Sequence, residues 1–93
     1  MNNITEEKLL KYFSVSEEAL KLAKDNKGSN YEYFNDFIDM ISRYISDAKH
    51  FYEKKDFVNA FAALNYAHGW LDAGARSNVF DVHDSRLFTV DDK

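Results

Sequence analysis

Apolar side chains recur at alternating intervals of four and three residues through the middle of the chain, and this spacing constrains the fold more than any other feature. The series comprises Phe34, Ile38, Ile41, Ile45, Ala48 and Tyr52. Alternating steps of four and three align side chains along one stripe of an α-helix. Along the flank of this stripe, a second set repeats every seven residues: Phe37, Tyr44 and Phe51. We therefore predict an amphipathic helix over residues 30–55 with many aromatic rings on its apolar side.

Two more helices, over residues 5–27 and 56–76, flank this one. The chain contains no proline, the residue that most often breaks a helix. Because the turn at residues 53–56 is short, the third helix must fold back antiparallel to the second. We therefore predict an all-α fold, a compact antiparallel three-helix bundle that forms a single domain over residues 1–93, with a short extended tail at 77–93.

Polar residues at the predicted helix starts support these bounds. Thr5 and Asp56 have side chains suited to cap the first and third helices. Ser29 and Glu32 fit a capping box at the start of the second helix. The run 14–17 also fits a capping box, and leaves open whether the first helix is divided.

The helical period ends after residue 77. The segments 79–82 and 87–90 have the composition of extended chain. Two arrangements suit them equally well. They could pair as a small hairpin, or form an arm that lies across the bundle or a neighbouring subunit.

Composition and charge narrow the classes of function. The net charge of −4 argues against broad nucleic-acid binding, which needs a basic surface. The absence of cysteine excludes disulfides and thiolate metal sites. No apolar run is long enough to span a membrane, and the N-terminal residues do not resemble a secretory signal. We therefore predict a soluble cytoplasmic protein without a membrane partner or a cofactor.

The third predicted helix contains the most unusual stretch, YAHGWLDAGAR at residues 66–76. Each of its two glycines, at 69 and 74, costs a helix about 1 kcal/mol relative to alanine. His68, Asp72 and Arg76 follow at intervals of four and can form a side-chain ladder, but such pairs contribute only about 0.2–0.5 kcal/mol each. We interpret the glycines as sites of close approach by another backbone. The ladder is a polar cluster at the core margin, with an acid/base pair or an anion site as the functional alternative.

Apolar residues surround the third helix almost completely, which indicates burial on more than one side. A bundle of three helices has too little surface to cover all of them, and large apolar patches usually mark interfaces. We therefore predict a protein–protein interaction or homo-oligomeric module, most simply a homodimer. The predicted interface residues are Phe37, Tyr44, Phe51, Tyr66, Trp70 and Ala73.

An enzymatic alternative rests on Arg76 and His83. Their spacing is similar to that of the arginine and histidine of the HEPN ribonucleases, which are helical and metal-independent. Arg43 and His50 have the same spacing but lie on the polar side of the second helix. Asp81, His83 and Asp84 offer oxygen and nitrogen donors, yet they make no complete ligand set, so no metal site is predicted.

The run RYISDAKHFYEKKDFVNAFAALNYAHGWLDAGAR, residues 43–76, resembles the small archaeal family known as domain of unknown function 357. YAHGWLDAGAR is the most specific part, and RLFTV at 86–90 is similar too. The resemblance implies an archaeal, cytoplasmic, compact helical protein, and carries over no catalytic residue, substrate or cofactor. Residues 53–67 are also loosely similar to one tetratricopeptide-type helix pair. A stable solenoid needs about three repeats, so this similarity suits an interaction module rather than a solenoid.

Overall fold

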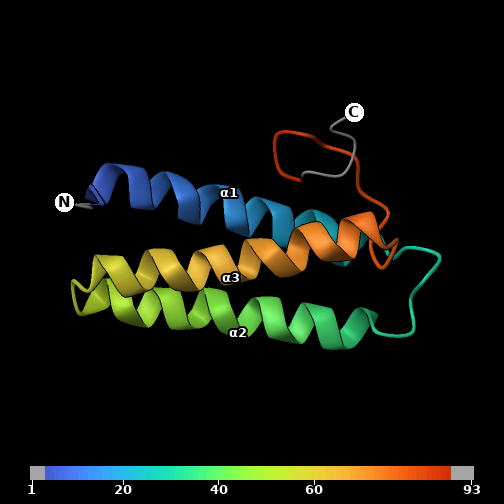
Figure 1. The fold of residues 1–93 in the computed structure, drawn as a ribbon, viewed down its shortest axis with the longest axis horizontal. Helices are drawn as coiled ribbons and strands as arrows, with labels where there is room; N and C mark the ends of the chain where they lie inside the picture. The colour runs from blue at the N-terminus through green and yellow to red at the C-terminus, as the bar shows by residue number, and fades with distance from the viewer. Residues whose placement is uncertain (1–3, 89–93) are drawn as a thin grey trace.

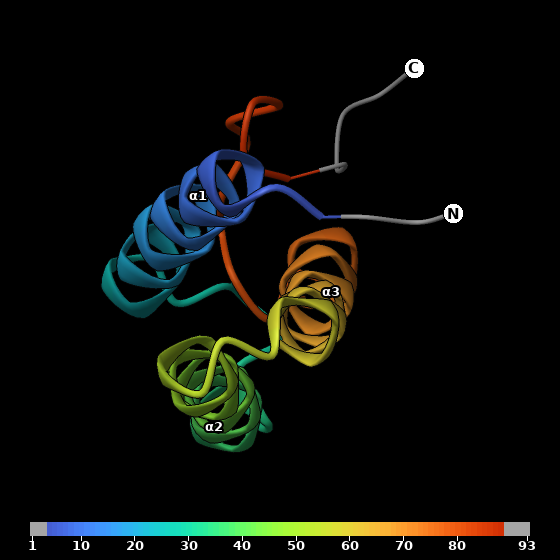
Figure 2. The ribbon, with the colours of Figure 1, turned by 90° about the vertical axis from the view of Figure 1, so that its left-hand side faces the viewer.

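The computed structural model describes residues 4–88. Three helices of 20 residues each make up the fold: α1 (Glu6–Asp25), α2 (Phe34–Glu53) and α3 (Phe57–Arg76). Figure 1 shows α2 running antiparallel to both other helices. Seen along their axes in Figure 2, the three helices form a triangle with an α1–α2, an α2–α3 and an α1–α3 side. The predicted all-α three-helix bundle is confirmed.

Side-chain caps begin α1 and α3 where the sequence predicted them. The Thr5 hydroxyl accepts a hydrogen bond from the Lys8 backbone N–H at 3.1 Å. The Asp56 carboxylate accepts one from the Asn59 backbone N–H at 3.2 Å. Each bond satisfies one of the backbone donors that a helix start leaves without a partner. α1 continues through residues 14–17 without a break, so the first helix is not divided.

The predicted capping box at the start of α2 is wrong. This helix begins at Phe34, and Tyr33 stands at its cap position without a side-chain capping bond. The preceding loop is instead held by the tail, because the Gly28 N–H bonds to the Val79 carbonyl and the Asn30 N–H to the Asn78 carbonyl, each at 2.9 Å. This pairing keeps the loop extended and delays the start of the helix.

The tail lies across the end of its own bundle and completes the core. Lys27 and Phe80 form an antiparallel bridge, and the Asp81 N–H bonds to the Asn26 carbonyl at 2.8 Å. Since segment 79–82 pairs with the α1–α2 loop, the arm prediction holds and no hairpin forms within residues 4–88. Residues 89 and 90 of the second predicted segment lie outside the described range. The tail buries five apolar side chains: Val79, Phe80, Val82, Leu87 and Phe88.

Two of the three glycines are explained by contacts with this tail. A Cβ atom at Gly28 would overlap the Asn78 carbonyl, so backbone approaches backbone there. A Cβ atom at Gly74 would overlap the ring of Phe80. The sequence predicted that another backbone approaches Gly74 closely. In the structure, the aromatic side chain of Phe80 in the tail occupies that position instead. The reason is that the tail turns back directly after α3, with Asn78 in a left-handed conformation (φ 65°).

No helix among residues 4–88 is long and apolar enough to cross a membrane.

Candidate functional site

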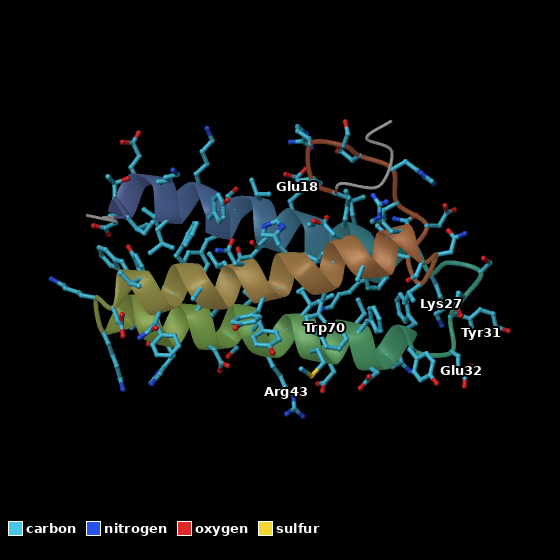
Figure 3. The ribbon with its side chains drawn as sticks, in the orientation of Figure 1. Glu18, Lys27, Tyr31, Glu32, Arg43 and Trp70 are labelled. Carbon is cyan, nitrogen blue, oxygen red and sulfur yellow. The ribbon has the colours of Figure 1, made fainter. Side chains whose placement is uncertain are left out.

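The six predicted interface residues lie together along the α2–α3 side of the bundle. We call this surface the aromatic face; it consists of Phe37, Tyr44, Phe51, Tyr66, Gly69, Trp70 and Ala73. Two neighbouring hollows of about 360 and 220 Å³ lie on it, and Tyr66 lines both. Figure 3 shows Trp70 at the boundary between α2 and α3, on the side turned toward the viewer. The α2 residues that repeat every seven positions therefore form one continuous surface with Tyr66, Gly69, Trp70 and Ala73 of α3.

Rings on the aromatic face are arranged in pairs that bridge the two helices. Tyr44 and Tyr66 stack with centroids 5.4 Å apart and planes inclined by 19°. Phe37 and Trp70 meet edge to face at 4.8 Å. Such pairs contribute about 0.5–1.5 kcal/mol beyond their buried area. Tyr66 nevertheless remains 62% exposed, and Gly69 and Ala73 are exposed beside it, whereas the other four residues of the face are half-buried.

Gly69 forms a notch in this face. It is exposed, and a Cβ atom built on it would meet nothing within 4 Å. Unlike Gly74, it is therefore not required by any packing among the described residues. A glycine inside a helix costs about 1 kcal/mol relative to alanine, and contacts within the described chain leave that cost unexplained.

A polar cluster joins α1 to α3 around His68. The Nε2 atom of His68 lies 3.0 Å from the hydroxyl of Ser16, which is fully buried. The Tyr12 ring packs against the imidazole with centroids 5.9 Å apart. Burial lowers the pKa of His68, and the nearby Asp72 carboxylate opposes this only in part. The imidazole is therefore neutral near pH 7 and serves as a hydrogen-bonding link between the two helices.

Ser16, His68 and Asp72 have the chemical identities of a nucleophile, a base and an orienting acid. Nucleophilic catalysis also needs the serine oxygen to reach a substrate. The complete burial of Ser16 prevents this, so Ser16 is not placed to act as a nucleophile, and the structural or ligand-binding role of His68 and Asp72 stays a prediction. Sequence reasoning missed Ser16 as the partner of His68. The sequence signal for this pair was a hydroxyl, Ser16, among the apolar residues of the first helix and an imidazole, His68, beside the apolar stripe of the third.

His68 and Asp72 line a pocket of about 410 Å³ between α1, α3 and the tail. The guanidinium that lines it belongs to Arg86 and not to the predicted Arg76. Arg86 bonds to Glu18 at 2.8 Å and to Asp84 at 3.1 Å, which fastens the tail to α1. The Arg86 bonds lower the pKa of Asp84. Arg76 is exposed at the last turn of α3, and its place in a ladder stays a prediction.

The residues of the ribonuclease hypothesis lie at the tail end of the bundle. His83 is exposed, and its Nε2 atom lies 2.9 Å from an Asp81 carboxylate oxygen. Within residues 4–88, no group of three or more histidine, cysteine or acidic side chains is arranged to hold a metal ion. The ribonuclease hypothesis stays a prediction.

Fold and contacts define the chain as a small three-helix bundle whose C-terminal tail completes its core. A family model described as "Protein of unknown function (DUF357)" matches residues 11–80. The chain therefore belongs to this family, as the resemblance implied. It matches no curated protein and no solved structure. An archaeal origin and a cytoplasmic location stay predictions.

Proposed function

We propose that this chain is a protein–protein interaction module that pairs with a second copy of itself through the aromatic face. The observation that carries the proposal is the open notch at Gly69. No contact among residues 4–88 requires a glycine at this position of the helix. The close approach of a second molecule to the helix would account for it. Exposed apolar surface on either side of the notch supports the same conclusion.

The charge of the face also supports an interface. Asp47 is the single charged side chain among the described residues that line the two hollows, although 30% of the chain is charged. Interface cores are depleted in charged residues and enriched in tyrosine and tryptophan. Tyr66 and Trp70 are therefore the expected anchors.

A second copy is the partner because the face is complementary to itself. In a twofold dimer, the same patch serves both subunits, so each projection must find a recess on the same patch. The aromatic face holds a projection, the exposed ring of Tyr66, and a recess, the notch at Gly69 about one helical turn further along α3. Two antiparallel copies would place each Tyr66 beside the partner's Gly69.

Sedimentation and light scattering test the pairing. The 10.9 kDa chain should show twice its mass at micromolar to millimolar concentrations. Gly69→Lys should shift it to a monomer, because a charged side chain then fills the notch. Ser14→Lys is the matched control, since Ser14 is also neutral and exposed but lies on α1, which contributes no residue to the two hollows. A monomeric wild-type chain, or equal effects of the two variants, would refute the proposal.

Gly69→Ala gives a finer test. Because its Cβ would meet nothing within 4 Å in the part of the chain that the structure describes, the variant should gain about 1 kcal/mol of stability from helix propensity. The same methyl group narrows the notch, so association should weaken. A stabilised chain that dimerises as strongly as before would show that the notch has no role in pairing.

A further inference from the structure

The α1–α2 side of the bundle carries a groove that is chemically distinct from the aromatic face. It has a volume of about 330 Å³, and lies on a different side of the triangle in Figure 2. Each helix contributes one stripe at intervals of three, four and seven residues, so the two stripes face each other along antiparallel axes. The α1 stripe comprises Glu17, Leu20, Lys21 and Lys24, and the α2 stripe Ser42, Ile45, Ser46 and Lys49.

This groove is basic on an acidic protein. Three lysines and one glutamate line it, which gives a formal charge of +2, against −4 for the whole chain. Lys49 and Glu17 form an ion pair at 2.8 Å and neutralise one end. Within residues 4–88 no ion pair involves Lys21 or Lys24. The positive charge is therefore concentrated at the other end.

Hydroxyl groups and an apolar floor complete the groove. The Glu17–Lys49 pair sets the register of the two antiparallel helices. Because both rise equally per residue, Lys21 lies level with Ile45 and Lys24 with Ser42. Ile45 is buried and Leu20 half-buried. Ammonium and hydroxyl donors beside a small apolar surface suit an anionic group attached to an organic body.

We propose that this groove binds a small soluble molecule that carries a phosphate group. The phosphate lies between Lys21 and Lys24 and accepts a hydrogen bond from the Ser42 hydroxyl. The remainder of the molecule covers Leu20 and extends toward Lys49. The volume falls at the lower end of the range for small-molecule sites, roughly 300–1,000 Å³. A nucleic acid would need an extended basic surface, whereas this groove holds three lysines on a chain with a net charge of −4.

Inorganic pyrophosphate is a suitable probe, titrated into isotope-labelled protein at constant ionic strength and followed by amide chemical shifts. Saturable shifts should centre on residues 21–24 and 42–46. Lys21→Gln/Lys24→Gln should weaken binding at least about tenfold, the usual effect of losing a charge-assisted hydrogen bond. Lys8→Gln/Lys11→Gln is the matched control, because it removes the same charge from exposed positions of α1 outside the groove. The control should change the affinity less than about twofold.

Ser42→Ala provides a second variant in which folding is not at risk, since alanine has the higher helix propensity. It should weaken binding about threefold or more, as expected for one lost hydrogen bond. Shifts spread over all lysines, or equal losses in both double variants, would overturn the proposal. So would an RNA oligonucleotide that binds more tightly than pyrophosphate with shifts outside the groove. Dimerisation is measured separately, so either proposal can fail without the other.

Discussion

Replacing Phe80 by alanine should remove a large part of the stability of this fold. Phe80 is fully buried, and its ring lies in the space left by Gly74, 5.7 Å from the centroid of Phe34 and 6.2 Å from that of Phe37. Truncation of a buried phenylalanine costs about 3–5 kcal/mol, with the larger values where the cavity cannot collapse. Gly74 has no side chain that could move into the cavity, so we expect about 4 kcal/mol. Domains of this size have a total stability of about 5–15 kcal/mol.

A double-mutant cycle with Gly74 sharpens this prediction. Gly74→Ala alone gains about 1 kcal/mol from helix propensity, but its Cβ would overlap the Phe80 ring. Overpacking of that kind costs about 1–3 kcal/mol, so the single variant should be destabilised. In the Phe80→Ala background that overlap is gone. The Phe37 ring, 3.2 Å from the added Cβ, can then shift into the space that Phe80 leaves, so the same substitution should be stabilising. The effect of Gly74→Ala therefore changes sign, which is the signature of direct contact.

Urea unfolding followed by circular dichroism, at one fixed protein concentration, measures all four corners of this cycle. Tyr31→Ala is the control, since Tyr31 is 64% exposed and its loss should change stability by about 0.5 kcal/mol or less. The tail would not be part of the core if Phe80→Ala cost under about 1 kcal/mol. The proposed contact would be refuted if Gly74→Ala had the same sign in both backgrounds.

Three further measurements test the remaining contacts. Burial lowers the pKa of His68, so below about pH 6.5 the unfolded chain binds a proton that the folded chain does not. The free energy of unfolding should therefore fall on acidification, and His68→Gln should flatten this slope. Asp56→Ala should cost about 1 kcal/mol in thermal or urea unfolding, because the Asn59 N–H loses its capping acceptor. An unchanged stability would mean that water replaces the cap fully. Labelled RNA incubated with the protein and a chelator should remain intact; cleavage that His83→Ala abolishes would instead establish the ribonuclease alternative.

The helices could be predicted because their signals are local. Apolar spacing defined the α2 stripe, and capping side chains at Thr5 and Asp56 act within three residues of their own position. The aromatic face follows from the same periodicity. Apolar residues that repeat every seven positions on α2 lie along one side of that helix, and the apolar side of its antiparallel neighbour α3 packs next to them. The start of α2 was the exception: its capping box was locally plausible, but the loop bonds to a segment almost 50 residues further along the chain.

The polar cluster around His68 shows what sequence reasoning could and could not establish. The interval between His68 and Asp72 was visible in the sequence, whereas the partner of the imidazole, Ser16, lies 52 residues away. Arg86 instead of Arg76 lines the neighbouring pocket, because the tail folds back over α1. The Ser16–His68 pair depends on how α1 packs against α3, and the position of Arg86 depends on the path of a tail that has no periodic pattern of its own.

By itself, the sequence determined three helices, their antiparallel order and the aromatic face, because these depend on spacing along one helix or across one short turn. Only the tertiary structure decided that the tail completes the core, that Phe80 occupies the space beside Gly74, and that Gly69 stays open. In the sequence, Gly69 and Gly74 cannot be told apart, because both are glycines inside the same predicted helix. They differ because the chain after α3 returns to one of them and leaves the other exposed.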